Sequence, residues 1–229
     1  MTDFPLRLPH AFVLLELEES SGKSLLRPHI SDLALSGAFY AELVFSNRLM
    51  CPSANRFTLS SVGKSTGLMQ LAEKLLPRGL FTHRQAIASL AVREESLRYE
   101  VLAELVAMGC LRMEVDEIFQ IPYQWRWPNA DFRVEQTVRN HLQSWLEKVT
   151  EEPPGREDAL LSLLRVTKLL SVVWSDAELE VLGPKIQKRT KRVPIGRTVK
   201  REIGSQQVEY SVRIVTDILS MLGQMSVNL

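Results

Sequence analysis

Residues 158–174 read DALLSLLRVTKLLSVVW, and this stretch indicates how the rest of the chain is arranged. Its apolar residues occupy most of the circumference of a helix, a pattern typical of a helix that is buried on all sides. It is shorter than the roughly 18 consecutive apolar residues that a helix needs to cross a bilayer. We therefore expect residues 158–174 to form a central helix, with the other elements of the fold packed around it.

Further helices are expected before and after this stretch. Apolar residues from 138 to 149 follow helical spacing behind Asn129 or Asp131, either of which can cap a helix, and the sequence EEPPG at residues 151–155 ends it. Ser205 can cap a last helix, in which one apolar stripe runs from residue 208 to residue 222. These patterns predict one helix directly before the central helix and one at the end of the chain.

The first half of the chain contains one pattern twice. From residue 30, apolar residues recur at helical spacing up to Asn47, which tolerates the left-handed conformation at a helix end, and two short apolar runs then flank a turn. The tetrapeptide AELV at residues 41–44 returns at residues 103–106, and Gly109 stands in the place of Asn47. We interpret residues 30–60 and 92–123 as two units, each a helix followed by a β-hairpin.

The remaining segments complete the prediction of the fold. Helical patterns over residues 68–76 and 85–97 lie between the two units, and a short apolar run at residues 11–17 fits either a strand or a helix. Long strands do not alternate with helices, which argues against Rossmann and barrel folds. We predict a mainly α fold: a single helical domain over residues 1–229 with a central apolar helix and two small β-hairpins.

The composition is that of a folded protein, with 45% apolar and 24% charged residues, which excludes disordered and collagen-like chains. The first nine residues lack the sections of a secretory signal. Cys51 and Cys110, the two cysteines, lie in no Cys-x-x-Cys motif and are expected to be reduced thiols in a cytoplasmic protein. A formal net charge of +1 argues against nucleic-acid binding by the surface as a whole, so the function must lie in local patches.

No motif for catalysis is complete. Gly63-Lys64-Ser65 follows a predicted strand, as a phosphate-binding loop would, but Thr58 occupies the position of the first glycine that such a loop needs. The four histidines are scattered without metal-ligand spacing, and no serine lies in a Gly-x-Ser-x-Gly motif. We therefore expect neither an enzyme nor a bound metal or cofactor.

Two local patterns indicate anion binding. The segment 185–201 contains eight lysines and arginines and no acidic residue, which favours contact with an anionic membrane, while the alternative is a solvated linker. The sequence YQWRW at residues 123–127 combines aromatic rings with one arginine, which suits either a membrane interface or packing at a corner. The residues that we expect to contact a membrane are Trp125, Arg126, Trp127, Lys188, Arg189, Lys191 and Arg192.

Several short motifs carry a family resemblance. VLLEL at residues 13–17 precedes a turn at Gly22, LSGA follows at residues 35–38, and Thr66-Gly67 opens a helix. Together with the segments around Asn47 and Gly109, their order over residues 8–222 resembles the Golgi phosphoprotein 3 family. The resemblance implies a mostly helical peripheral membrane protein that binds phosphatidylinositol 4-phosphate, and it implies cytoplasmic tails of membrane enzymes as further partners.

The resemblance also implies candidate headgroup ligands. In the members that bind this lipid, one tryptophan and three arginines converge on the headgroup. The corresponding positions here are Arg27 at the tryptophan, Ser36 and Glu95 at two arginines, and Arg98 at the third. Only Arg98 matches by type, and the Glu95 carboxylate would repel a phosphate. We take Arg98, Arg27, Ser36 and Arg93 as the candidate headgroup ligands.

These observations lead to the hypothesis of a cytoplasmic peripheral membrane protein, which in a eukaryotic source would lie at a Golgi-like membrane. We expect the fold to gather the cations into one electropositive surface that binds anionic phospholipid. Acids at residues 114, 116 and 117 would oppose the approach of the second hairpin to such a membrane. A homo-oligomer is left open. The alternative is a winged-helix-like module for nucleic acid or protein without lipid binding, although these acids make nucleic acid an unfavourable partner.

Overall fold

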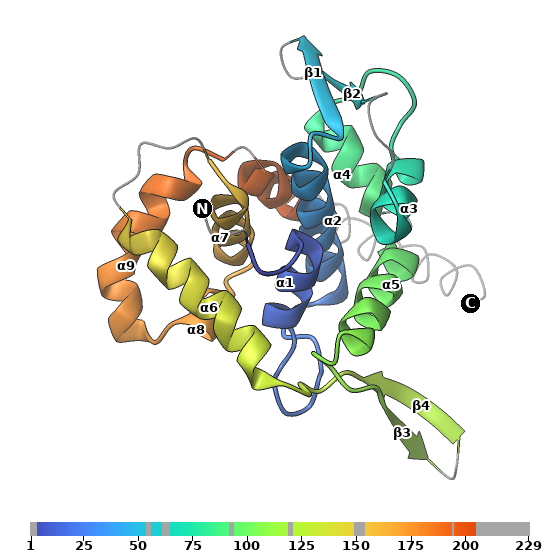
Figure 1. Cartoon of the computed structure of the whole chain (residues 1–229), viewed down its shortest axis with the longest axis vertical. Coiled ribbons are helices and arrows are strands. Elements are labelled where there is room, and N and C mark those ends of the chain that lie inside the picture. The colour runs from blue at the N-terminus through green and yellow to red at the C-terminus, as the bar shows by residue number, and fades with distance from the viewer. Residues whose placement is uncertain are drawn as a thin grey trace, which may run out of the picture.

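Helices dominate the structure, and two antiparallel hairpins project from opposite ends of its long axis (Figure 1). The computed structural model describes residues 4–53, 56–60, 65–91, 94–118, 121–148, 154–193 and 195–204. The helices are α1 (Leu8–Glu16), α2 (Pro28–Phe45), α3 (Gly67–Leu75), α4 (His83–Ala91), α5 (Glu94–Ala107), α6 (Phe132–Glu147), α7 (Arg156–Val166), α8 (Leu170–Val173) and α9 (Asp176–Thr190), followed by helical residues 195–204. The strands are β1 (Leu49–Ser53), β2 (Arg56–Leu59), β3 (Glu114–Ile118) and β4 (Ile121–Arg126). The predicted mainly α fold with two small hairpins is confirmed.

The centre of the fold is formed by α1, α2 and α7. Every residue of α1 is buried, so the short apolar run at residues 11–17 is a core helix, and α7 is buried from Glu157 to Leu164. The close approach of α2 depends on Gly37, where a Cβ would lie 2.8 Å from the Val199 side chain and 3.0 Å from that of Leu163. A larger residue at this position would push α2 away from both neighbours.

The central helix is shorter than its sequence pattern predicts. α7 ends at Val166 because Lys168 adopts a left-handed φ of 64°, and α8 follows as a separate short helix. The Leu169 amide closes the break by donating to the Leu164 carbonyl at 2.8 Å. Apolar residues on both sides of the break pack into the same core, so the periodicity of the sequence does not reveal it.

Both helix-plus-hairpin units have the order that the repeated pattern predicts. α2 ends before Asn47, with a φ of 56°, and leads into β1 and β2, whereas α5 ends before Gly109, with a φ of 73°, and leads into β3 and β4. In each unit the left-handed residue turns the chain out of the helix. On its second edge β2 exchanges two main-chain hydrogen bonds through Phe57 with Phe81, at 2.8 and 2.9 Å.

At three boundaries the structure divides a predicted helix, selects one of two predicted caps, or does not describe the residues concerned. The helical pattern over residues 85–97 is divided between α4 and α5. Asp131 caps α6, because its Oδ1 accepts from the Arg133 amide at 3.0 Å, whereas Asn129 donates its amide to Glu135 at 2.9 Å. The helix that Ser205 is expected to cap lies outside the described residues.

Two partly or fully buried histidines are expected to make stability fall in mild acid. Burial lowers the pKa of both His10 and His83, so the unfolded chain takes up protons at a higher pH than the folded one. The free energy of unfolding should therefore decrease as the pH falls below about 6.5, the ordinary histidine pKa. Urea unfolding at a series of pH values tests this, and the variant His10→Gln/His83→Gln should show a flatter dependence. An equally steep dependence in the variant would contradict the assignment.

Candidate functional site

The end of α1 carries a buried ion pair that fixes the α1–α2 loop, residues 17–27. The Glu16 carboxylate has no exposed surface. Arg98 of α5 binds it in a bidentate manner, with Nη2 3.0 Å from Oε1 and Nη1 3.2 Å from Oε2. Ser31 donates its hydroxyl to Oε1 at 2.6 Å, and Ser24 of the loop donates to the same oxygen. The charge of Arg98, the one candidate that matches the family by type, is thus offset inside the protein by a two-point contact.

The other candidate headgroup ligands lie in different environments. Arg27 is exposed directly before α2, where its carbonyl accepts from the Ser31 amide at 3.0 Å. Ser36 is buried and donates its hydroxyl to the Asp32 carbonyl at 2.8 Å, one turn earlier in α2. Arg93 lies outside the described residues. The structure therefore brings Arg98 to the first turn of α2, which Arg27 precedes, and leaves Ser36 away from the surface.

The two tryptophans of the aromatic cluster, whose side chains the structure describes, lie in different environments. Trp125 is 46% exposed, whereas Trp127 is partly buried against the core. Arg126 pairs across the hairpin with Asp116 at 2.7 Å and with Glu114 at 3.4 Å. Two carboxylates therefore surround the one guanidinium, and the cluster presents an aromatic ring without a net positive charge.

The α1–α2 loop holds the base of this hairpin. Gly22 has a left-handed φ of 65°, and its carbonyl accepts from the Trp127 amide at 3.2 Å. A Cβ on Gly22 would lie 2.1 Å from the Trp127 carbonyl carbon, so only glycine fits. Since the pair of Glu16 and Arg98 fixes the same loop, Arg98 positions the base of the hairpin through that loop.

The charges of the α1–α2 loop are balanced. The Glu18 carboxylate accepts from the Ser21 amide at 2.6 Å and from the Ser20 hydroxyl at 2.8 Å. These hydrogen bonds, those from Ser21 above all, lower the pKa of Glu18 to about 2, which keeps it ionised. Lys23 and Arg27 supply two exposed cations in the same loop. With Glu18 and Glu19 beside them, this loop is not a strongly cationic surface.

The basic segment 185–201 is folded, which excludes the solvated-linker alternative. It occupies the second half of α9 and much of the helix at residues 195–204. A capping box starts α9, in which the Ser175 amide donates to the Glu178 carboxylate at 2.8 Å. Seven of the eight cations in the segment are exposed, and we call them the basic face: Lys185, Lys188, Lys191, Arg192, Arg197, Lys200 and Arg201.

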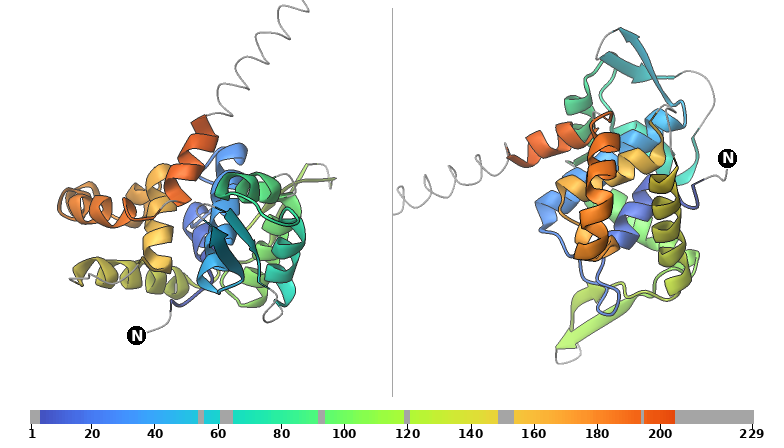
Figure 2. Two further views of the ribbon diagram at one scale, coloured as in Figure 1. Left: turned by 90° about the horizontal axis from the view of Figure 1, so that it is seen from above. Right: turned by 90° about the vertical axis from the view of Figure 1, so that its left-hand side faces the viewer.

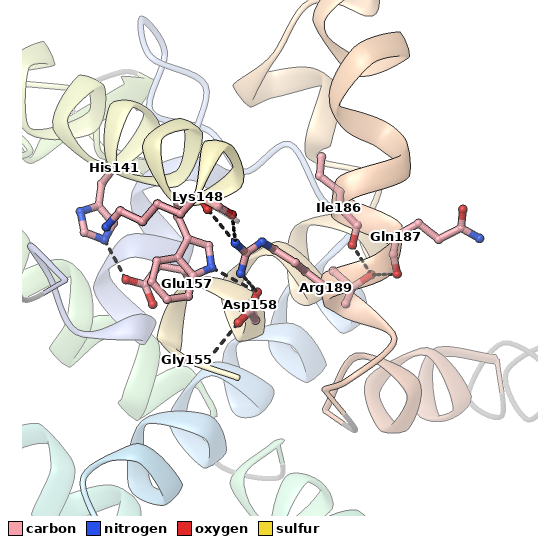
Figure 3. A network of polar contacts seen from close by, with 10 residues as sticks. His141, Lys148, Gly155, Glu157, Asp158, Ile186, Gln187 and Arg189 are labelled. Atoms are coloured by element: carbon pink, nitrogen blue, oxygen red, sulfur yellow. Dashed lines mark hydrogen bonds and ion pairs between the residues drawn. The ribbon is translucent and has the colours of Figure 1, made fainter. Parts of the chain in front are cut away.

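The eighth cation, Arg189, points inward (Figure 3). Its Nη2 donates to the Trp145 and Lys148 carbonyls at 2.9 Å each, and its Nη1 lies 3.5 Å from Asp158 Oδ1. Trp145 lies beneath the guanidinium at 4.9 Å and donates its indole N–H to Asp158 Oδ1 at 3.2 Å. Arg189 thus binds carbonyls at the end of α6, which lack helical partners, and is not available to a membrane.

The expectation that folding gathers the cations into one surface is wrong. α9 lies on the opposite side of the molecule from the β3–β4 hairpin in Figures 1 and 2. Arg98 and Arg126 both carry carboxylate partners, as described above. The basic face is therefore separate from the hairpin end, and it holds more exposed cations than the α1–α2 loop.

Sequence reasoning missed Glu16, although a signal for it exists. Glu16 is the one acidic residue in the apolar run VLLEL, which lies at the centre of the core. A carboxylate in such a run must be paired, since an isolated buried charge is strongly unfavourable. The sequence does not show its partner, because Arg98 lies 82 residues away along the chain.

Two negative findings concern the described residues alone. None of their helices is both long and apolar enough to span a membrane. Nor do their histidine, cysteine, aspartate and glutamate side chains form a group of three or more that is placed to hold a metal ion.

Comparison with known proteins places the chain in a family. None of the curated proteins matches it. The family model described as Golgi phosphoprotein 3 (GPP34) matches residues 8–206, a range that includes every helix and strand described above. The resemblance that the short motifs carry is thereby confirmed. The chain belongs to the Golgi phosphoprotein 3 (GPP34) family.

Proposed function

We propose that this chain is a non-enzymatic peripheral membrane protein that binds anionic phospholipid through the basic face. The observation that carries the proposal is the set of seven exposed cations on a folded segment, residues 185–201, that contains no acidic residue. The Golgi phosphoprotein 3 family is one of non-enzymatic lipid-binding and adaptor proteins, which supports the same conclusion.

Binding by the basic face is electrostatic. Each cation close to an anionic membrane contributes about 1 kcal/mol, and salt screens the attraction over about 8 Å at physiological ionic strength. Ile186, Val193 and Val199 are buried beneath the face, whereas the seven cations of the basic face stay exposed. Arg98, the family's matching headgroup arginine, is engaged by Glu16. Binding should therefore follow the charge density of the membrane and not the identity of one headgroup.

Removing two of these cations should weaken membrane binding by a measurable factor. The variant Lys188→Gln/Lys191→Gln is expected to lose about 2 kcal/mol, or about 30-fold in the partition coefficient. The measurement is co-sedimentation with vesicles of phosphatidylcholine alone, or of phosphatidylcholine mixed with phosphatidylserine or a phosphoinositide at equal surface charge. The wild-type protein should pellet with both anionic mixtures at low salt and be released from them at high salt. With neutral vesicles it should stay in the supernatant.

A matched variant tests where on the protein the membrane binds. Lys23→Gln/Arg27→Gln removes the same charge from the α1–α2 loop, and we expect it to bind anionic vesicles as the wild type does. Loss of binding in this variant alone would move the membrane contact to the hairpin end. Equal binding of the wild type to neutral and anionic vesicles would remove the electrostatic basis of the proposal.

A further inference from the structure

A hollow of about 550 Å³ lies between β2 and the connection from α3 to α4. Leu59 of β2, Glu73 and Lys74 of α3, and Arg78 and Gly79 of the connection are among its lining residues. α3 and β2 lie away from α9 in Figures 1 and 2, so the hollow is separate from the part of the basic face that lies on α9, at Lys185 and Lys188.

The hollow carries an uncompensated positive charge. Glu73, the one acid among the described residues that line the hollow, is already engaged, because Arg48 contacts it through Nε at 2.6 Å and Nη2 at 3.2 Å, and Ser65 donates a third hydrogen bond. Lys74 and Arg78 are both exposed, and neither forms an ion pair with a residue that the structure describes. Two cations are thus available to a ligand with carboxylates.

The hollow also contains an open strand edge. Phe57 bonds Phe81 on one edge of β2, and Thr58 pairs with Met50 on the other, so the N–H and C=O of Leu59 point to the same edge as those of Phe57. The residue opposite Leu59 in that register is Gly79, which has turned away with a left-handed φ of 78°. Leu59 consequently has no main-chain partner among the described residues of this edge.

We propose that the hollow binds an extended acidic segment of a partner protein. The main chain of the segment adds to β2 at Leu59, and its carboxylates pair with Lys74 and Arg78. An extended peptide uses both the N–H and the C=O of the open edge, whereas a bare phosphate can use only the N–H. Leu76 and Pro77 give the hollow an apolar lining that suits the side chains between the carboxylates. This combination of features favours a peptide over a small anion.

The test uses the full chain and a labelled decapeptide of alternating glutamate and valine, with binding measured by fluorescence anisotropy. We expect the wild type to bind this peptide and not its lysine–valine counterpart. The variant Lys74→Gln/Arg78→Gln should bind the glutamate peptide about 10-fold more weakly, which is within the range for the loss of two exposed ion pairs. The same peptide with N-methyl groups at alternate residues should also bind weakly, because it cannot complete the strand.

The variant Lys188→Gln/Lys191→Gln is the matched control. It should keep the affinity for the peptide, while Lys74→Gln/Arg78→Gln should keep the binding to anionic vesicles, so that this inference and the proposed function can fail separately. Equal affinity of the wild type and Lys74→Gln/Arg78→Gln for the peptide would overturn the inference. So would full binding of the N-methylated peptide, or displacement of the peptide by inorganic phosphate or anionic vesicles at equal charge.

Discussion

Replacing Arg98 with alanine is expected to lower the free energy of unfolding by about 3–5 kcal/mol, as is typical when one partner of a buried ion pair is removed. The Glu16 carboxylate has no exposed surface, and the variant removes both of its guanidinium contacts. Ser24 and Ser31 would be left as its partners. Urea unfolding of the variant, followed by circular dichroism, measures the loss. A decrease of less than about 1 kcal/mol, the value for an exposed pair, would contradict the role assigned to this ion pair.

Two further variants distinguish the effect of breaking the buried ion pair from the effect of removing any arginine. Arg133→Ala removes an arginine that pairs with Asp131 at 2.8 Å but is itself 90% exposed, and it should cost less than about 1 kcal/mol. The double variant Glu16→Leu/Arg98→Leu replaces both charges with apolar side chains and should recover much of the stability, because no charge is left buried and unpaired. If the double variant lost as much free energy of unfolding as Arg98→Ala, packing and not charge would account for the effect of Arg98.

Replacing Arg189 with alanine is expected to cost about 3 kcal/mol or more. The variant leaves the Trp145 and Lys148 carbonyls at the end of α6 without their donor, and it removes the cation that faces both the Trp145 ring and Asp158. Asp158 retains hydrogen bonds from the Trp145 indole and the Gly155 amide, so α7 should keep its own start. Urea unfolding measures this loss as well.

The neighbouring residue provides the control. Lys188→Ala changes an exposed cation one position away, so it should leave the unfolding midpoint nearly unchanged and weaken binding to anionic vesicles. Arg189→Ala should do the reverse under conditions in which it stays folded. If the two variants had the same effects on stability and on vesicle binding, the division of the basic segment into inward and outward cations would be wrong.

The helices and hairpins could be predicted because their signals are local. The helical spacing that ends at Asn47, and its repetition at Gly109, correspond to left-handed residues that lead out of α2 and α5. The break after α7 had no such signal, because Lys168 adopts a left-handed conformation that is uncommon for lysine. Local chemistry therefore specified the elements, while one interruption depended on the packing around it.

The candidate site was less predictable because charge compensation is a property of the folded chain. Arg98 and Arg126 were predicted as lipid contacts, and in the fold they face carboxylates that are distant in sequence or across a strand pair. The inward direction of Arg189 did have a local signal, because Leu182, Ile186 and Arg189 follow helical spacing and are all buried. Applying the periodicity test to cations as well as to apolar residues would have separated Arg189 from Lys188.

The attachment of the β3–β4 hairpin has an evolutionary consequence. None of its described side chains from Glu114 to Arg126 belongs to the hydrophobic core. The α1–α2 loop holds the chain directly after the hairpin through the hydrogen bond between Gly22 and Trp127. Mutations in the projecting part therefore escape the purifying selection that core packing imposes. A chimera in which only the hairpin sequence is exchanged for another hairpin of the same length should therefore still fold.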